Sequence, residues 1–315
     1  MTKKTVLVTG ASGFLGRPLV DRLLGAGYAV RVVTRGSAPP FPNKVDVAII
    51  PDLANAFDWK PILAGVNIVV HLAGLAHADV RETTPRTFDS INRVATQNLV
   101  RATRDEGIER FVFISSVRAQ TGSSAIATVR EADSARPTNE YGRSKLAAES
   151  AVRAAGVPFT ILRPVVVYGP HAKGNIQTLV QLASKPLPLP FSGFSSRRSM
   201  LGIDNFISAV LFVTNNPAAV GETYLVADSR AFTLAEIVTM LRKAQGREAG
   251  LFNIPPVLFR LALRLMNQSE VWARLGEELV VETTKLQTLG WRPANTTYEG
   301  FIAMMRAVGG ERLKS

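Results

Sequence analysis

The sequence predicts an α/β protein in which a doubly wound parallel sheet is followed by a smaller mixed α/β C-terminal lobe. Short β-branched runs alternate with helical patterns through the first 120 residues, which is typical of parallel strands with crossover helices. A glycine-rich turn follows the first of these runs. Beyond Ser134 the pattern changes, and the last 65 residues show little strand pattern, which favours a separate lobe.

The strands expected in the sheet are short and rich in β-branched residues. In order they are Thr5–Val8, Ala29–Val33, Val45–Ile50, Ile68–His71, Phe111–Ser115, Phe159–Val167 and Thr223–Val226. Apolar residues at helical spacing predict the helices. These are Leu15–Ala26, Phe57–Leu63, Phe88–Glu106, Tyr141–Ala155, a helix from just after Asp204 to about Thr214, and Thr233–Gln245. Thr233 and Glu236 form a capping box, and three prolines make Lys185–Phe191 an extended loop.

The glycine-rich turn lies in VLVTGASGFLG, residues 6–16, where Gly10, Gly13 and Gly16 separate a buried strand from a helix. Such a turn lets the backbone approach a pyrophosphate without Cβ interference, and it presents free N–H groups at the helix N-terminus. The spacing is one residue longer than the usual Rossmann fingerprint. Its position inside a βαβ unit favours a dinucleotide site over a plain turn, and therefore a Rossmann-type sheet. We expect residues 1–168, with parts of 200–228, to form the dinucleotide-binding domain, and residues 169–315 mainly a substrate-binding lobe.

The end of the second strand bears on the choice between NAD and NADP. A site specific for NAD places a carboxylate there against the ribose 2′-OH, whereas this chain has Thr34, 24 residues after Gly10, followed by Arg35. An arginine can accept a 2′-phosphate, so the sequence slightly favours NADP. A surface arginine beside an NAD site is the alternative. Asp52, after the third strand, either meets the adenine edge or is an ordinary loop aspartate.

Tyr141 and Lys145 lie four residues apart in YGRSK, so a helix directs both side chains from one face. An adjacent ammonium stabilises a phenolate, and we therefore expect Lys145 to lower the pKa of Tyr141 and make the pair a proton-transfer device. Upstream, FVFISSV ends a strand in two serines at the edge where ligands bind in such sheets. Ser116, 25 residues before Tyr141, is expected to hydrogen-bond the substrate oxygen that Tyr141 protonates.

Several motifs together resemble a known family. They are TGASGFLG (residues 9–16), HLAG (71–74), Asn92, ISS (114–116), YGRSK (141–145) and LRPVVVYGP (162–170). On these motifs the chain resembles, over essentially its whole length, an extended short-chain dehydrogenase/reductase of the NAD-dependent epimerase/dehydratase branch. The resemblance implies that Tyr141 is the acid/base, that Lys145 binds the nicotinamide ribose and that Ser116 orients the substrate hydroxyl. The segment SSVRAQTG is one residue longer than the common form, which leaves Ser115 as an alternative.

The residues expected to contact cofactor and substrate follow from these motifs. For NAD or NADP they are Gly10, Ser12, Gly13, Phe14, Leu15, Gly16, Thr34, Arg35, Asp52, Leu53, Leu72, Ala73, Gly74, Asn92, Ile114, Tyr141, Lys145, Pro164 and Val167. For the substrate they are Ala76, Ser116, Arg118, Asn175, Arg197 and Arg198. The last two arginines suit a sugar-linked diphosphate, and a solvated basic loop is the alternative. No metal is expected, because the only histidines, His71, His77 and His171, fit no helix-borne site.

The resemblance implies a 4-epimerase acting on a nucleotide-linked or polyprenyl-diphosphate-linked sugar by transient oxidation at C4. An NADPH-dependent 4-keto-sugar reductase is the nearest alternative, slightly favoured by Thr34 and Arg35. A dehydratase is disfavoured, because Val117 and Arg118 stand where its extra acid/base pair would lie. A non-catalytic cofactor-binding scaffold remains an alternative, although such proteins often lose the tyrosine or the lysine.

Composition bears on partners and location. The 315 residues include 37 basic and 25 acidic ones, a net charge of +12, and no cysteine, which excludes disulfides, thiol nucleophiles and zinc–cysteine sites. With no run of about 18 apolar residues we expect a cytoplasmic protein. Pro255–Leu275, which carries Arg260, Arg264 and Arg274, is expected to pack on the lobe or to contact an anionic membrane. We expect no nucleic-acid partner, and a homodimer through the two long helices.

Overall fold

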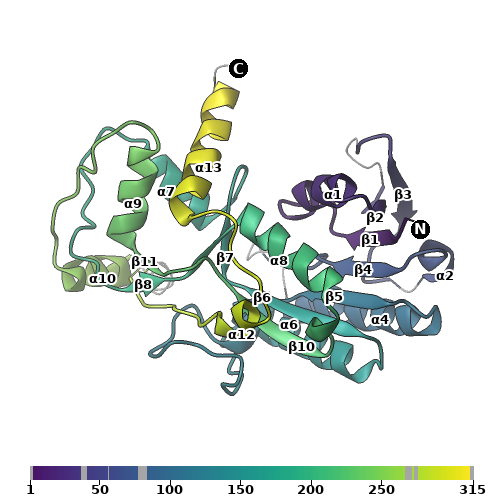
Figure 1. Cartoon of the computed structure of the whole chain (residues 1–315). Coiled ribbons are helices and arrows are strands. Elements are labelled where there is room, and N and C mark those ends of the chain that lie inside the picture. The colour runs from purple at the N-terminus through teal and green to yellow at the C-terminus, as the bar shows by residue number, and fades with distance from the viewer. Residues whose placement is uncertain are drawn as a thin grey trace.

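The computed structural model describes residues 3–36, 41–55, 57–76, 84–266, 272 and 276–312. At its centre lies a seven-stranded parallel sheet in the order β10-β6-β5-β4-β1-β2-β3 (Figure 1). The strands are β1 Thr5–Thr9, β2 Ala29–Arg35, β3 Val45–Ile50, β4 Ile68–His71, β5 Arg110–Ile114, β6 Phe159–Pro164 and β10 Glu222–Val226. All seven were expected from the sequence within two residues at each end, β6 excepted, and the predicted fold class is confirmed.

The strand order reverses between β1 and β4, which pair with each other although β2 and β3 separate them in the chain. Thr9, at the end of β1, is level with His71, at the end of β4, and with Val33 on β2. The carboxyl ends of the central strands therefore lie at one edge. Ligands of doubly wound sheets bind in the crevice at this reversal.

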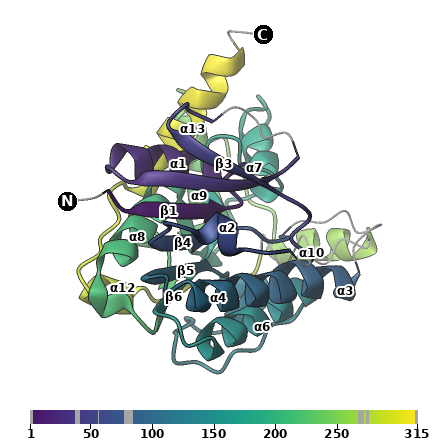
Figure 2. The same cartoon turned by 90° about the vertical axis from the view of Figure 1, so that its right-hand side faces the viewer.

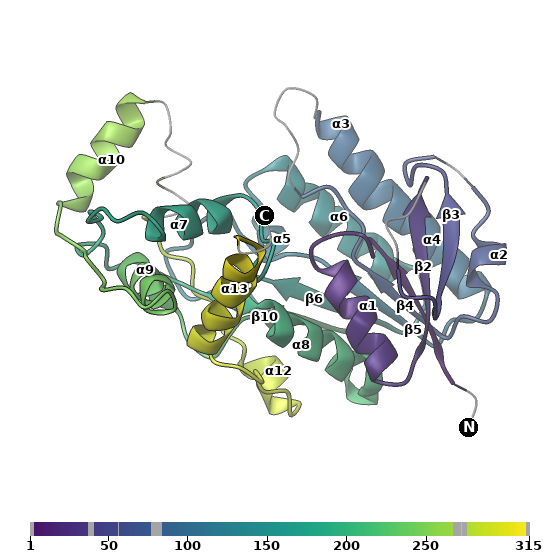
Figure 3. The same ribbon diagram turned by 90° about the horizontal axis from the view of Figure 1, so that it is seen from above.

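Helices cover both faces of the sheet, and successive residues of β1 enter two different cores. Val6 and Val8 pack with α1 (Gly16–Gly25) and α8 (Ile203–Asn215), whereas Leu7 packs with α4 (Ala95–Asp105) and α6 (Glu140–Ala154). Figure 3 shows α1 and α8 on one side of the sheet and α4 and α6 on the other. A strand buried on both faces reads as a continuous apolar run, as VLV does here.

The helix expected over Phe88–Glu106 is longer and less regular than the sequence indicates. It begins with α3 (Pro85–Phe88), whose first turn is capped by Thr84, continues through a π-helical segment (Asp89–Val94) and ends as α4. Figure 2 shows this segment running along α6. A π-helical segment inside an α-helix is rare and often marks a functional site; this one contains Asn92.

The strand expected over Phe159–Val167 is two strands. It breaks at Val165, after which β7 (Val166–Tyr168) leaves the sheet and pairs with β9 (Met200–Gly202). Pro164 ends β6, and the lack of a backbone N–H on proline is suited to the end of a ladder. From this point the chain enters the C-terminal lobe, although α8 and β10 later return to the main sheet.

The C-terminal lobe is built on a third apolar cluster. Its elements are α7 Asn175–Ala183, β8 Arg197–Arg198, β11 Phe232–Thr233, α9 Leu234–Lys243, α10 Pro256–Leu265 and α13 Thr297–Arg312. The helix α12, Thr284–Thr288, packs instead on β10 of the main sheet, where Leu286 joins the first core. The remaining short elements are α2 Lys60–Leu63, α5 Val117–Gln120 and a 3-10 turn at Pro217–Ala219. The predicted capping box is present at the start of α9, where the Thr233 side chain accepts a hydrogen bond from the Glu236 N–H.

Candidate active site

Two positions in the turn after β1 have no room for a side chain. Gly10 has φ +71°, and a Cβ there would lie 2.8 Å from the Ala73 backbone nitrogen. A Cβ on Gly16 would lie 2.2 Å from the Gly10 carbonyl oxygen. No side chain caps the start of α1. The turn thus has the close backbone approach and the uncapped helix N-terminus that a pyrophosphate requires, so these residues fit a dinucleotide.

The edge beside this turn is held by a buried chain of hydrogen bonds through His71. The Ala73 N–H donates to the Thr9 hydroxyl oxygen at 3.2 Å, and Thr9 Oγ1 lies 2.6 Å from His71 Nδ1. On its other side His71 Nε2 lies 2.9 Å from Thr96 Oγ1, which donates to the Asn92 carbonyl oxygen at 2.6 Å. Burial, helped by the charge of Lys145, lowers the pKa of His71 to about 3. A neutral ring that donates from Nε2 and accepts at Nδ1 satisfies every member of the chain.

Asn92 extends the same network to α6. Its Oδ1 accepts the Leu75 N–H at 2.7 Å, and its Nδ2 donates to the Leu75 carbonyl oxygen at 3.0 Å and to Ser144 Oγ at 2.9 Å. A Cβ on Gly74 would lie 3.0 Å from Asn92 Oδ1 and 3.6 Å from Lys145 Nζ. The loop after β4 is therefore fixed against α6 with its backbone exposed to the crevice.

The two serines at the end of β5 have different partners. Ser115 Oγ donates to the Glu149 carboxylate at 2.6 Å. The Ser116 hydroxyl lies close enough to the Tyr141 side chain to lower the pKa of that phenol, and its Oγ accepts the Arg118 N–H at 3.1 Å as the cap of α5. Of the two alternatives left by the sequence, Ser116 is therefore the one that shares a site with Tyr141.

Tyr141 and Lys145 leave the same face of α6, but the expected effect of the lysine on the tyrosine is absent. Burial raises the pKa of Tyr141. The nearby Ser116 hydroxyl and the charge of Arg118 lower it by a smaller amount, so the pKa stays above its ordinary value. The expectation that Lys145 holds the pKa of Tyr141 below its ordinary value is wrong for this structure. The Lys145 ammonium instead donates to the Ile114 carbonyl oxygen at 2.7 Å and lies 4.5 Å from the centre of the Phe113 ring. Burial lowers the pKa of Lys145 to about 8, although the charge of Glu149 opposes this.

Arg197 and Arg198 have different neighbours. Arg198 donates to the carbonyl oxygens of Glu277 at 2.6 Å and Ser123 at 2.9 Å. Burial and the nearby charge of Arg118 lower the pKa of Arg198 to about 10, against the opposing charge of Glu277. Arg197 is exposed and contacts the Ala231 carbonyl oxygen at 3.5 Å. The structure thus brings Arg198 and Arg118 toward one region beside Tyr141, and it does not bring Arg197 there.

At the end of β2, Thr34 is buried and its hydroxyl has no hydrogen-bond partner in the structure. A ribose hydroxyl would supply the missing partner. The neighbouring Arg35 guanidinium lies 3.1 Å from the Asp52 carboxylate, and both side chains are largely exposed. The Ala54 N–H, and after it Arg35, hold the pKa of Asp52 below its ordinary range.

A cavity of about 580 Å³ adjoins the glycine turn, and Ser12, Gly13 and Phe14 line it together with Arg17 and Lys173. The other predicted site residues lie near the same edge or on the facing lobe. Leu53 follows β3, Leu72 follows β4, Ile114 and Pro164 end β5 and β6, Val167 lies on β7, and Asn175 begins α7. Ala76 is the last described residue of its loop, and His77 falls outside the described residues.

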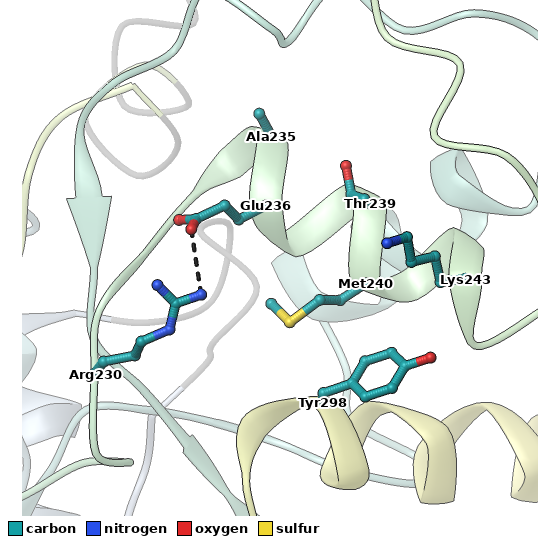
Figure 4. A pocket seen from close by; sticks show the side chains of 7 residues that line it. All are labelled: Arg230, Ala235, Glu236, Thr239, Met240, Lys243 and Tyr298. Atoms are coloured by element: carbon teal, nitrogen blue, oxygen red, sulfur yellow. Dashed lines mark hydrogen bonds and ion pairs between the residues drawn. The ribbon is translucent and has the colours of Figure 1, made fainter.

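A second cavity, of about 490 Å³, lies between α9 and α13 in the C-terminal lobe (Figure 4). Seven residues line it: Arg230, Ala235, Glu236, Thr239, Met240, Lys243 and Tyr298. Arg230 and Glu236 form an ion pair across its rim at 3.2 Å. None of these seven residues was expected in the site, and none belongs to the group around Tyr141.

Two features of the site were missed from the sequence. For His71 the only expectation from the sequence was that it binds no metal, although its place before Ala73 and Gly74 is a signal for a role at the edge. Glu149 was not singled out, yet it follows Lys145 by four residues on the same helical face and forms a buried, two-point ion pair with Arg163 (2.6 and 2.8 Å). In the described part of the chain, no cluster of three or more His, Asp or Glu side chains is arranged to hold a metal ion.

Comparison with known proteins agrees with this geometry. Residues 6–227 match the NAD dependent epimerase/dehydratase family. The chain belongs to that family. It is 32% identical over 310 residues to a UDP-glucose 4-epimerase of Vibrio cholerae, a match that covers 95% of this chain and 93% of the relative. The family and the enzyme class expected from the sequence are therefore confirmed.

More distant relatives share the fold of this epimerase/dehydratase. The N-acetyl-alpha-D-glucosaminyl-diphospho-ditrans,octacis-undecaprenol 4-epimerase of Escherichia coli O157:H7 is 26% identical over 79% of this chain and 75% of its own length. The solved structure of MoeE5 in complex with UDP-glucose and NAD has a TM-score of 0.77 and 24% identity, covering 99% of this chain and 100% of that one. Within the described residues, no helix combines the length and hydropathy that crossing a bilayer requires.

Proposed function

We propose that this family member is a 4-epimerase of a sugar diphosphate. The observation that carries the proposal is the placement of the Ser116 hydroxyl beside the Tyr141 side chain at the carboxyl edge of β5, with Lys145 one helical turn away and bound to the Ile114 carbonyl oxygen. The similarity to a UDP-glucose 4-epimerase over nearly the whole chain supports it. The glycine turn and the unpartnered Thr34 hydroxyl fit a dinucleotide at the adjacent crevice.

When bound, NAD or NADP would accept a hydride from the sugar C4 and return it. Tyr141, as its phenolate, would take the proton of the 4-hydroxyl and return it to the same oxygen after the hydride has added to the opposite face of C4. Burial alone disfavours this phenolate, and the positive charge of a bound oxidised nicotinamide would favour it. Ser116 would hold the same oxygen in line. Lys145, with a pKa of about 8, is largely protonated at neutral pH and would bind the ribose from its place beside Gly74.

For the cofactor we propose a slight preference for NADP. No carboxylate occupies the position of Thr34, and Arg35 beside it would meet a 2′-phosphate. Asp52 already holds Arg35 at 3.1 Å, so a 2′-phosphate would have to replace or share that contact. The dinucleotide that is released when purified protein is denatured tests the preference. A tightly held NAD⁺ would speak against it.

For the substrate we propose that Arg198 and Arg118 face the diphosphate and the sugar, and that Asn175 on the lobe side and Ala76 in the loop after β4 complete the site. Either a nucleotide or a polyprenyl group would satisfy an arginine that binds the diphosphate. A lipid carrier would place the reaction at a membrane surface, so the proposal includes peripheral contact with an anionic bilayer. The absence of cysteine fits a reducing compartment, and we propose a cytoplasmic location.

We propose that residues 1–168, with parts of 200–228, act as the cofactor domain and that residues 169–315 act mainly as the substrate lobe. The return of β10 to the sheet beside β6 supports the first part of this division. A homodimer through α4 and α6 is the proposed assembly, because both helices run along one face of the sheet.

A 4-keto-sugar reductase remains the second candidate, since Thr34 and Arg35 suit NADPH. Purified protein incubated with UDP-galactose, UDP-N-acetylglucosamine and a 4-keto-6-deoxy sugar nucleotide, with and without NADPH, separates the functions. Product without cofactor consumption supports the epimerase, and stoichiometric NADPH loss supports the reductase. Absence of turnover with all three substrates, with and without NADPH, would favour a non-catalytic scaffold. Tyr141→Phe should remove most activity while dinucleotide binding is retained.

A further inference from the structure

Helix α10 has apolar side chains on two opposite faces. Phe259 and Leu263 face the C-terminal lobe, where the Phe259 ring lies 5.5 Å from Phe194 and Leu263 is only 8% exposed. The opposite face carries Val257, Leu258, Leu261 and Leu265, which are 73%, 57%, 51% and 81% exposed. These four share a face because Val257 and Leu258 precede Leu261 by four and three residues and Leu265 follows it by four. A helix that only packed on the lobe would need one apolar face.

The outward face is bordered by positive charge. Arg260 and Arg264, one turn apart, lie between the buried and the outward faces and are exposed. Residues 249–266 contain these two arginines and no acidic residue. The combination of an apolar face with arginine flanks is that of a helix lying in the plane of a membrane interface.

A neighbouring loop adds to the same character. The chain around Leu187 runs beside Phe252, where Leu189 N–H donates to the Gly250 carbonyl oxygen and Phe252 N–H to that of Leu189. Leu187 is 61% and Phe252 43% exposed, and Lys185 is exposed beside them. Figure 3 places α10 at the end of the molecule farthest from β2 and β3, so a flat surface could reach it.

We propose that α10, with Leu187 and Phe252 beside it, docks the protein on an anionic lipid bilayer. A second copy of the chain fits this face less well. A two-fold contact would bring Arg260 and Arg264 of both copies together, and no acidic residue of 249–266 would offset their repulsion. Anionic headgroups supply the missing negative charge. Docking goes beyond the proposed reaction and does not depend on it.

Co-sedimentation of the full chain with vesicles tests the docking. We expect binding to vesicles of phosphatidylcholine mixed with phosphatidylglycerol, weakening as salt rises, and little binding to phosphatidylcholine alone. Leu261→Gln/Leu265→Gln should weaken binding about tenfold or more. The matched control Ile49→Gln/Ile126→Gln removes two exposed apolar residues elsewhere and should change nothing. Arg260→Gln/Arg264→Gln should weaken binding about fivefold for each arginine at low salt. The matched control Arg22→Gln/Lys44→Gln removes two exposed positive charges elsewhere and should leave binding unchanged.

The lack of native cysteine allows a second measurement that needs no loss of binding. Leu258→Cys, labelled with an environment-sensitive fluorophore, should shift to shorter wavelength when anionic vesicles are added, whereas labelled Ile49→Cys should not. Turnover of a water-soluble nucleotide sugar by the α10 variants should equal that of the wild type, so a failed epimerase assay leaves the docking test intact. Absence of binding to anionic vesicles at low salt would overturn the proposal. So would α10 variants that bind unchanged, or that alter only the oligomeric state.

Discussion

Ser115 and Ser116 follow one another in the chain but lie beside different turns of α6. Ser115 reaches the buried Glu149 in the third turn of that helix, whereas Ser116, one residue further on, caps α5 and lies beside Tyr141 at the start of α6. The sequence motif contains both, and the partner that decides between them, Glu149, lies 34 residues further along the chain. The choice therefore depends on how α6 packs on the sheet, which a local pattern does not contain.

Substituting each serine should show which of the two catalysis requires. Ser116→Ala removes the hydroxyl beside Tyr141 and should lower kcat by about 10²–10³-fold, and the loss of the α5 cap should cost about 0.5–2 kcal/mol of stability. Ser115→Ala leaves a buried carboxylate oxygen short of a donor and should cost about 1–3 kcal/mol of stability. Steady-state kinetics and urea unfolding of both variants check this. Equal loss of kcat in the two would contradict the assignment.

Lys145 illustrates a conflict between stability and function at one residue. It is 4% exposed and its pKa falls from 10.5 to about 8, which corresponds to roughly 3 kcal/mol of unfavourable burial of the charge. Lys145→Met should therefore have a higher unfolding free energy than the wild type at pH 7 without cofactor, by up to roughly 3 kcal/mol. The same substitution should abolish activity.

The sign of this effect fixes its pH dependence. Below pH 8 the lysine is protonated in both folded and unfolded chains, so its contribution is constant. Between pH 8 and 10.5 the unfolded chain binds more protons, so wild-type stability rises with pH relative to Lys145→Met. Urea unfolding of both proteins at pH 7, 9 and 10 measures the difference. If the difference in unfolding free energy between the two proteins stayed constant from pH 7 to pH 10, burial of the lysine charge would not be the cause of that difference.

At the scale of elements, α6 is anchored to the sheet by a buried ionic group as well as by apolar packing. The Glu149 carboxylate is fully buried and accepts hydrogen bonds from Arg163 on β6, Arg153 on its own helix and Ser115 at the end of β5. Burial raises the pKa of Glu149, but the hydrogen bonds and charge of Arg163 outweigh it and leave the pKa lowered. The helix that carries Tyr141 and Lys145 is thereby fixed relative to Ser116.

The same helix offers a matched pair of carboxylates for testing this anchor. Glu149→Ala should destabilise the protein by about 3–5 kcal/mol, because it leaves Arg163 buried without its partner. Glu140→Ala removes an exposed ion pair with Arg143 and should leave stability almost unchanged, because water and salt screen exposed ion pairs. Thermal unfolding monitored by circular dichroism compares them. Similar losses in the two variants would mean that Glu149 does not anchor the helix.

The sequence predicts best those elements that are determined by a few neighbouring residues. The seven strands and the box at Thr233 and Glu236 follow from runs and caps of a few residues, and they are confirmed. The π-helical segment around Asn92 and the break at Val165 arise from contacts with α6 and with β9, elements far along the chain. The pKa of Tyr141 was likewise expected in the wrong direction, because helical spacing shows that two side chains share a face but not how deeply they are buried.

At the scale of the whole molecule, the candidate site lies between the main sheet and the C-terminal lobe. Tyr141, Ser116 and Arg118 come from elements of the sheet, and Arg198 comes from β8 in the lobe. Arg198 also joins the two parts directly, since its guanidinium binds carbonyl oxygens of Ser123 and Glu277. Two of the positive charges that contribute to the net charge of +12, Arg118 and Arg198, therefore lie where an anionic substrate would bind between the main sheet and the C-terminal lobe. Composition alone could not locate these charges.

Arg197 and Arg198 provide the test of this arrangement, because adjacent residues of equal charge have different neighbours. If Arg198 binds the diphosphate in both ground and transition states, Arg198→Lys should raise KM by about tenfold or more with kcat nearly unchanged. Arg197→Lys should leave both constants within about twofold of the wild type. Initial rates with a nucleotide sugar at several ionic strengths measure this, and KM of the wild type should rise with salt. A lower kcat at constant KM in Arg198→Lys would point to a disturbed fold between the two parts, and equal effects of both variants would remove Arg198 from the substrate site.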